Sequence, residues 1–218
     1  MGSNLNLNYQ IEEYINSHSI KLHPVQYEII KYNETLGEIK KMQISISQCH
    51  FLHLIVKIIK PKNILEIGTF TGLSALTMGL AMDENSKLTA LDKNKETSDV
   101  AMSFFKKAKI DNKINLLINN AIVSLDDLHN QKKKFDFIFI DADKENYINY
   151  FNHSLNILNN NGIIVVDNVL WYGDVADQNK NDRLTLKIRE FNKFIKDDNR
   201  VESLILPIGD GLSVCRKK

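Results

Sequence analysis

The sequence has little cysteine and almost no net charge, and both features narrow the functions that fit it. Only Cys49 and Cys215 occur among 218 residues, and neither belongs to a Cys-x-x-Cys pair. A disulfide scaffold or a zinc ribbon is therefore not expected, and a reducing cytoplasm is the expected location. Lys and Arg number 28 against 27 Asp and Glu. We therefore expect no long-range attraction to nucleic acid or to a membrane.

Targeting and membrane-spanning segments are also not expected. No apolar run in the sequence is long enough to span a bilayer, and the polar, asparagine-rich start does not resemble a signal peptide. No internal repeat or low-complexity linker divides the chain, and 218 residues suit one domain. We expect a single domain over residues 1–218, with a helical N-terminal cap at 1–60 and an α/β core at 61–218.

The first sixty residues have the apolar periodicity of helices. Apolar residues recur at helical spacing around residues 11–15 and along Val25–Glu38. A third helix is expected over Ser47–Ile59, with Ser47 as its N-cap and Pro61 just beyond its end.

From residue 63 onward, apolar strands alternate with helices. Strands are expected at 63–68, 87–92, 114–119, 135–141 and 162–168, and helices at 71–82, 94–108, 123–129, 145–158 and 183–196. This alternation predicts an α/β fold with a mainly parallel sheet covered on both faces. Two further strands flank Gly209-Asp210-Gly211, and such a tight turn makes one of them antiparallel.

A glycine-containing loop follows the first expected strand. The stretch LEIGTFTGLSA places Glu66, Gly68 and Gly72 in a Glu-x-Gly-x-x-x-Gly pattern, whose glycines are expected to let the backbone pass close to a ligand. Phe70 stands where a dinucleotide fingerprint has its middle glycine, so a pyrophosphate fits poorly. Asp92 ends the next strand, where an acid binds ribose hydroxyls in nucleotide-binding folds. A turn or a helix cap would explain either feature alone, but together they favour a cofactor site.

Acidic and amide side chains end two later strands. Asp141 ends the strand at 135–141, and Asp167 and Asn168 end the strand at 162–168. If these strands are neighbours, about 4.8 Å apart, three oxygen ligands converge beyond their carboxyl ends, where such sheets bind ligands. Two carboxylates and an amide suit Mg²⁺, with Ca²⁺ or Mn²⁺ as alternatives, and leave positions open for substrate. An isolated Asp-Asn pair would also be explained as a turn cap.

Three stretches together resemble one enzyme family. FDFIFIDADKENYINY, GIIVVDNVLWYGDV and LPIGDGLSVCRK are similar to the metal-dependent class I S-adenosylmethionine O-methyltransferases, in the caffeoyl-CoA O-methyltransferase group and its bacterial relatives. Catechol O-methyltransferase is a more distant likeness. The resemblance runs from about Met42 to Arg216. It implies a Rossmann-like methyltransferase fold: a doubly wound, seven-stranded, mainly parallel sheet with an antiparallel last strand and N-terminal helices. It also implies a homodimer.

The resemblance further implies roles for individual residues. Asp141, Asp167 and Asn168 would hold the divalent cation. Lys144 would be the candidate base, with Asp141 as the other candidate for taking the proton. The S-adenosylmethionine site would comprise Ile44, Glu66, Gly68, Thr69, Ser74, Asp92, Ala121 and Asp143.

The acceptor is expected to be a small catechol-like or phenolic molecule. Trp171 and Tyr172 are predicted to wall an aromatic substrate, although an interface or core position explains them equally well. Tyr172 stands where the plant enzymes have an asparagine that meets the substrate, and the N-terminal recognition segment does not match theirs. Both departures argue against an acyl-CoA acceptor.

The predicted chemistry begins with a hydroxyl of high pKa. Forming a phenolate at pH 7 costs roughly 4 kcal/mol, because a phenol has a pKa of about 10. Lys144 can act as a base only if burial or a nearby cation lowers its pKa. Otherwise it is a surface lysine paired with Asp141 or Asp143.

Three other functions fit the sequence less well. Phe70 and the acidic strand ends argue against a nicotinamide oxidoreductase. The intact set of Asp141, Lys144, Asp167 and Asn168 argues against a non-catalytic cofactor binder. The neutral charge argues against a nucleic-acid methyltransferase.

Overall fold

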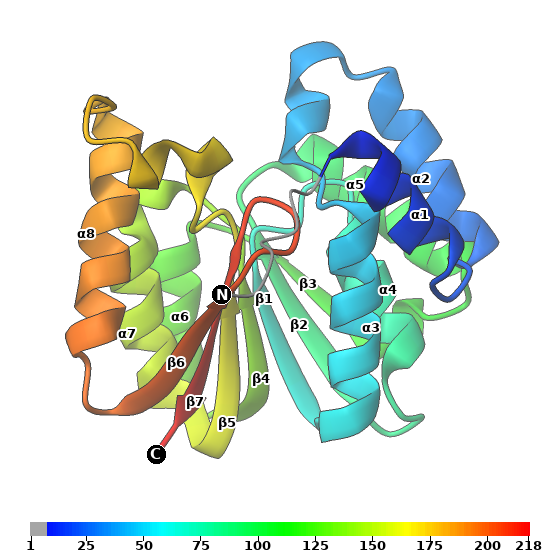
Figure 1. The fold of residues 1–218 in the computed structure, drawn as a ribbon. Coiled ribbons are helices and arrows are strands. Elements are labelled where there is room, and N and C mark those ends of the chain that lie inside the picture. The colour runs from blue at the N-terminus through cyan, green and yellow to red at the C-terminus, as the bar shows by residue number, and fades with distance from the viewer. Residues whose placement is uncertain (1–7) are drawn as a thin grey trace.

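The computed structural model describes residues 8–218, which form a seven-stranded sheet with helices on both faces (Figure 1). The strand order is β3-β2-β1-β4-β5-β7-β6. Strands β1 to β5 pair in parallel, whereas β7 is antiparallel to both β5 and β6. The doubly wound α/β fold with an antiparallel last strand is therefore confirmed.

The elements alternate along the chain as the sequence predicts. The strands are β1 Asn63–Ile67, β2 Lys87–Asp92, β3 Ile114–Ile118, β4 Phe135–Ile140, β5 Leu158–Val166, β6 Val201–Leu206 and β7 Leu212–Lys217. The α-helices are α1 Tyr9–Ser17, α2 Pro24–Glu34, α3 Ile46–Ile59, α4 Leu73–Ala81, α5 Lys95–Lys107, α6 Ala121–Asn130, α7 Tyr147–Ile157 and α8 Arg183–Asp197. Short 3₁₀ helices are η1 Gly37–Met42, η2 Asp111–Lys113, η3 Lys144–Asn146 and η4 Trp171–Ala176.

Two buried clusters lie on opposite faces of the sheet. Side chains of α2 to α5 pack on one face, and side chains of α6 to α8 pack on the other. Strand β4 contributes to both, because Phe137 and Phe139 face the first cluster while Ile138 and Ile140 face the second. All four are fully buried. Burial on both faces explains why this strand is apolar throughout Phe137–Ile140.

The helix boundaries in the N-terminal part differ from the prediction at two points. Ser45, and not Ser47, is the N-cap of α3, because its hydroxyl accepts the Gln48 amide at 3.2 Å while the Gln48 side chain accepts the Ser45 amide at 2.7 Å. This reciprocal capping box starts the helix two residues early. Helix α2 ends at Glu34 rather than Glu38, and Gly37, at φ +62°, then leads into η1.

One segment qualifies by length and composition as a membrane-crossing helix, contrary to our expectation of none. This segment is Gly37–Ile59. Its backbone leaves the helical region at Gln43, with ψ 137°, and at Ser45, with ψ 163°, so η1 and the 14-residue α3 are separate helices. A spanning helix needs about 20 residues. Helix α3 instead packs Cys49, Leu52 and Val56 into the core.

Strands β4 and β5 are adjacent and parallel, with Ile140 opposite Val166. Asp141 and Asp167 each follow the last residue of one of these strands, and the Asp167 amide donates to the Ile140 carbonyl at 3.0 Å. The strand ends therefore bring the two acids to the same edge of the sheet, as predicted. Strand β5 begins at Leu158 instead of residue 162, because Leu158 already pairs with Phe135.

Candidate active site

A cleft of about 790 Å³ lies at the carboxyl ends of β1, β2, β4 and β5. It gathers all of the predicted site residues except Glu66. Those lining it are Ile44, Gly68, Thr69, Ser74, Asp92, Ala121, Asp141, Asp143, Lys144, Asp167, Asn168, Trp171 and Tyr172. Sheet topology thus brings side chains from distant parts of the chain together at one site.

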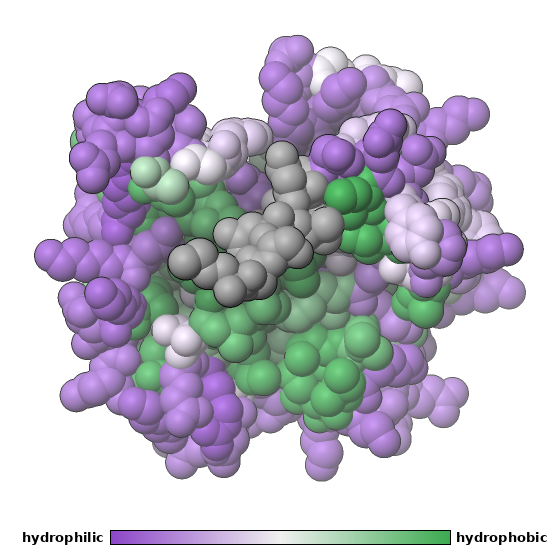
Figure 2. Space-filling view, viewed as in Figure 1, coloured by the Kyte–Doolittle hydropathy of each residue, from purple (hydrophilic) through white to green (hydrophobic). Residues whose placement is uncertain are grey.

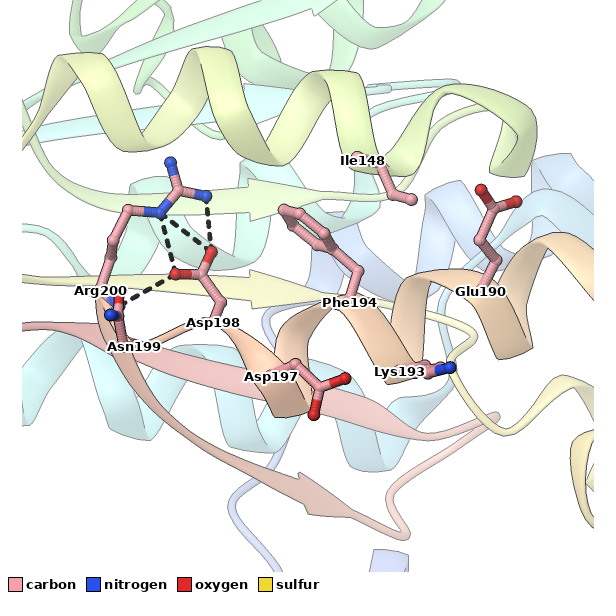
Figure 3. Close-up of a pocket in the computed structure, with 8 residues that line it drawn as sticks. All are labelled: Ile148, Glu190, Lys193, Phe194, Asp197, Asp198, Asn199 and Arg200. Atoms are coloured by element: carbon pink, nitrogen blue, oxygen red, sulfur yellow. Dashed lines mark hydrogen bonds and ion pairs between the residues drawn. The ribbon is translucent and has the colours of Figure 1, made fainter.

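A second, more open groove of about 540 Å³ lies beside α8 (Figure 3). It holds none of the predicted site residues. Its lining is Ile148, Glu190, Lys193, Phe194, Asp197, Asp198, Asn199 and Arg200. The Arg200 guanidinium donates to the Asp198 carboxylate, at 2.9 Å from Nε to Oδ1. This ion pair fixes the turn between α8 and β6.

Asp92 shapes the loop that follows β1. Its Oδ2 accepts the backbone amides of Thr69 at 2.9 Å and Phe70 at 2.8 Å, and its Oδ1 accepts the Asn94 amide at 2.8 Å. Phe70 has φ +50°, a left-handed conformation that few non-glycine residues adopt. The carboxylate therefore holds this loop in place, and its remaining lone pairs are available to ligand hydroxyls.

The two loop glycines are needed for packing within the protein. A Cβ on Gly68 would lie 2.0 Å from the Asp141 carbonyl oxygen, and one on Gly72 would lie 2.7 Å from the Phe105 ring. Gly68 also lines the cleft, but Gly72 does not. Gly72 thus lets α4 approach α5, and its expected proximity to a ligand stays a prediction.

Glu66 lies in β1 and is fully buried. Neither of its carboxyl oxygens has a hydrogen-bond partner among the described residues. Burial raises the pKa of Glu66 to about 8, against the lowering effect of the nearby Ser74 and Thr69 hydroxyls. An unpaired buried carboxyl group of this kind is neutral at pH 7 and needs a partner that can satisfy its polar atoms.

Asp141, Asp167 and Asn168 form the oxygen-bearing rim that the sequence predicts. Asp167 is only 2% exposed, and its Oδ1 accepts from Gln48 Nε2 at 2.5 Å and from the Asn168 amide at 2.6 Å. Burial, and then the neighbouring Asp141 charge, raise the pKa of Asp167 well above its ordinary value. Two carboxylates this close repel each other, so a bound cation would relieve the repulsion.

The donor set fits a hard divalent cation. No three His, Cys, Asp or Glu side chains within residues 8–218 are grouped closely enough to hold a metal ion. The rim instead offers two carboxylates and the amide oxygen of Asn168. Mg²⁺ is commonly held by one or two carboxylates and retains several waters, so this set suits it better than a metal that needs a full protein cage.

Lys144 lies beside Asp141 and is not a surface residue. Its Nζ is 2.9 Å from Asp141 Oδ1, and its side chain is 13% exposed. Burial lowers the pKa of Lys144, but the Asp141 carboxylate and Tyr147 together raise it by more, so the net pKa lies above the ordinary value. The ion pair with Asp141, which the sequence offered as an alternative role for Lys144, is therefore present. It lies in the cleft and not on the surface.

Trp171 and Tyr172 lie on a strained loop at the mouth of the cleft. Their φ angles are +48° and +55°, and Gly173 follows at +86°. Such conformations cost about 1–3 kcal/mol for each non-glycine residue and persist only when surrounding contacts enforce them. Tyr172 is 74% exposed, and its ring centroid lies 5.5 Å from that of Trp171.

Sequence reasoning missed several residues that line the cleft, and three of these support other site residues through hydrogen bonds. Gln48 holds Asp167, and Tyr150 donates its hydroxyl to Asp143 at 2.6 Å. Asp210 accepts the Tyr172 amide at 2.5 Å. Only Asp210 could have been found from the sequence, because it is an acid within the predicted tight turn Gly209-Asp210-Gly211.

Known proteins resemble the chain over most of its length. A family model described as O-methyltransferase matches residues 16–218. Caffeoyl-CoA O-methyltransferase of Populus kitakamiensis is 35% identical over 189 residues, which cover 83% of this chain and 80% of that protein. A flavonoid 3',5'-methyltransferase of Vitis vinifera is 36% identical over 185 residues, covering 81% and 79%. The solved O-methyltransferase of Bacillus cereus in complex with SAH has a TM-score of 0.87 at 29% identity, covering 96% of this chain and 97% of that one.

Proposed function

The chain belongs to the O-methyltransferase family, and on this premise we propose that it methylates a small catechol-like or phenolic acceptor with the help of a divalent cation. S-adenosylmethionine is the methyl donor. A family assignment that covers residues 16–218 excludes the oxidoreductase reading. The observation that carries the proposal is the convergence of Asp141, Lys144, Asp167 and Asn168 at one rim of the cleft.

The cleft has the chemistry that S-adenosylmethionine requires. Asp92 stands at the end of β2 with lone pairs available for ribose hydroxyls. Ile44, Thr69, Ser74, Ala121 and Asp143 line the same cavity. Glu66 lies beneath it and needs a polar partner. SAH, which the Bacillus cereus relative binds, is the product left when this donor gives up its methyl group.

The rim residues account for activation of the acceptor. A cation held by Asp141, Asp167 and Asn168 would lower the pKa of the acceptor hydroxyl and align a vicinal pair of hydroxyls. Lys144 would take the hydroxyl proton after releasing its own ammonium proton to solvent, because a second positive charge beside Asp141 would lower its raised pKa. The acceptor oxygen then bonds to the methyl carbon while the carbon–sulfur bond breaks and its electron pair stays on sulfur.

The acceptor side of the cleft favours a small aromatic molecule. Trp171 and Tyr172 line it, and aromatic rings pack well against a phenolic ring. Tyr172 replaces the asparagine that meets the substrate in the plant enzymes resembled. The described part of the N-terminal segment, residues 8–60, contributes Ile44 and Gln48 to the cavity.

We infer a homodimer from an uncovered apolar face. The described helices leave the β5–β7–β6 part of the α3 side of the sheet open (Figure 1), and apolar side chains gather there (Figure 2). Leu204 on β6 is 52% exposed, and Leu54 and Ile58 on α3 are 60% and 67% exposed. Apolar patches of this kind mark association sites.

Two buried free thiols, Cys49 and Cys215, fit the reducing cytoplasm.

Methylation of a panel of acceptors tests the proposed function. The protein is incubated with S-adenosylmethionine and with catechol, caffeic acid, a flavonoid catechol or caffeoyl-CoA, in Mg²⁺ or in EDTA, and products are measured by mass spectrometry. We expect single methylation of free vicinal diols that stops in EDTA and resumes with excess Mg²⁺. Equal rates in EDTA would contradict the cation, and methylation of caffeoyl-CoA alone would contradict the acceptor class.

A further inference from the structure

The turn between β6 and β7 reaches the active-site cleft, and its central acid contacts the segment that follows β5. Asp210 accepts three hydrogen bonds from that segment. Its backbone oxygen accepts the Leu170 amide at 3.0 Å. Its carboxylate accepts the Tyr172 amide at 2.5 Å on Oδ1 and Asn168 Nδ2 at 3.3 Å on Oδ2. The Asp210 side chain thus contacts both Asn168 at the rim and Tyr172. Tyr172 and Trp171 together form what we call the acceptor wall.

Close packing on both sides holds the turn between β6 and β7 in one position. A Cβ on Gly209 would lie 2.5 Å from Gln48 Cδ, and a Cβ on Gly211 would lie 2.4 Å from Leu170 Cγ. Both glycines have positive φ, at +57° and +88°. The turn is therefore wedged between α3 and the segment after β5, with no room to shift on either side.

Contact with a carboxylate decides how the Asn168 amide is turned. A carboxylate can only accept hydrogen bonds, so the amide group must present its nitrogen to Asp210. The amide oxygen then lies on the other side of the group, away from Asp210. An oxygen is the atom that a hard cation requires. Without Asp210, the amide could turn over and place its nitrogen at the rim instead.

The Asp210 carboxylate also helps to hold the strained backbone of the acceptor wall in place. Asn168, Trp171 and Tyr172 all have left-handed φ angles, at +56°, +48° and +55°. Such a backbone relaxes unless tertiary contacts hold it. The Tyr172 amide bond to Asp210 is one such contact and lies directly at a strained residue.

We propose that Asp210 is a positioning residue, which turns the Asn168 amide oxygen toward the cation site and holds Trp171 and Tyr172 in their left-handed conformation. The Asn168 role rests on the proposed function, whereas the role at the acceptor wall does not. In this proposal Asp210 does not contact the reacting atoms.

The first test uses Asp210→Asn, which keeps the shape of the side chain. An amide at this position must turn its own NH₂ toward either Tyr172 or Asn168, so one bond is lost. Trp171 is the one tryptophan of the sequence, so its fluorescence reports the wall directly. Without cation or cofactor, we expect red-shifted emission and stronger acrylamide quenching in Asp210→Asn than in wild type. Glu202→Gln, which removes an exposed acid from the same hairpin, is the matched control.

Cation affinity provides the second readout. Calorimetry with Mg²⁺ should show affinity about tenfold weaker in Asp210→Asn, because side chains that support metal ligands typically contribute 10–100-fold. S-adenosylmethionine affinity should stay within about twofold, which a general loss of folding would not allow. An aspartate at position 168 presents an oxygen to the rim in either orientation, so Asp210→Asn should weaken Mg²⁺ binding much less in an Asn168→Asp background than in wild type.

The outcomes separate the inference from the function on which it rests. Wild-type fluorescence and wild-type Mg²⁺ affinity in Asp210→Asn would overturn the inference. A fluorescence change without a change in Mg²⁺ affinity would overturn the Asn168 role. Equal weakening of Mg²⁺ binding by Asp210→Asn in the wild-type and Asn168→Asp backgrounds would do the same. If wild-type protein bound no Mg²⁺, the cation proposal would fail, and the fluorescence comparison would still decide the role at the acceptor wall.

Discussion

Glu66 should make the stability of the cofactor-free protein depend on pH in a way that one substitution removes. Its carboxyl group is fully buried and unpaired among the described residues. Burial, its largest influence, raises its pKa to about 8. The unfolded chain exposes the same group with a pKa of about 4.3. The folded state therefore binds this proton more tightly than the unfolded state does.

The difference between the folded and unfolded pKa of Glu66 sets the direction in which stability changes with pH. A carboxyl group whose pKa is raised by folding stabilises the fold fully below the unfolded value, and the contribution is lost as pH rises toward the folded value of about 8. The slope within this window is about 1.36 kcal/mol per pH unit. Between pH 6 and pH 8, wild type should lose about 2 kcal/mol of unfolding free energy through Glu66 alone.

Glu66→Gln has nearly the same shape but does not titrate. Urea unfolding of both proteins at pH 6, 7 and 8 gives the difference in their unfolding free energies, from which other titrating groups cancel. We expect this difference to shift by about 2 kcal/mol in favour of the variant as pH rises. Glu202→Gln, at an exposed position, should track wild type. Parallel pH profiles for Glu66→Gln and wild type would refute the buried neutral carboxyl group.

Three further substitutions test the cleft and the apolar face. Lys144→Ala should lower kcat by about 10²–10⁴ and leave KM nearly unchanged, with a smaller defect on an acidic nitrocatechol; activity within twofold of wild type on catechol would move the proton transfer elsewhere. Asp92→Ala should weaken S-adenosylmethionine binding in calorimetry by about 10–100-fold, as expected for lost charged hydrogen bonds; unchanged affinity would remove Asp92 from the cofactor site. Leu204→Glu should convert a dimer to a monomer in sedimentation, whereas an intact dimer would place the interface elsewhere.

Much of the rim was predictable because it depends on local sequence and one topological rule. Asp141 and Asp167 each follow an apolar strand, and alternating strands and helices imply a parallel sheet whose strand ends share one edge. Adjacency of β4 and β5 then brings the acids together. Only the neighbour relationship had to be assumed, and the structure confirms it.

The supporting residues could not be predicted in this way. Gln48 reaches Asp167 across 119 positions of sequence, and the capping box that orients its side chain depends on Ser45 rather than Ser47. The packing role of Gly72 could not be predicted either, because only the folded structure shows Phe105 beside it. Contacts between elements distant in sequence leave no local pattern, so they appear only after the chain has folded.

The central claim is that Asp141, Asp167 and Asn168 hold a divalent cation where the acceptor binds. Titration with Mn²⁺, followed by the electron paramagnetic resonance signal of the free ion, measures this directly. With SAH and catechol present, wild type should bind one Mn²⁺ per chain. Asp167→Asn should weaken that binding at least about tenfold, because even side chains that only support metal ligands contribute that much. Absence of a site in wild type, or equal Mn²⁺ affinity in Asp167→Asn, would contradict the claim.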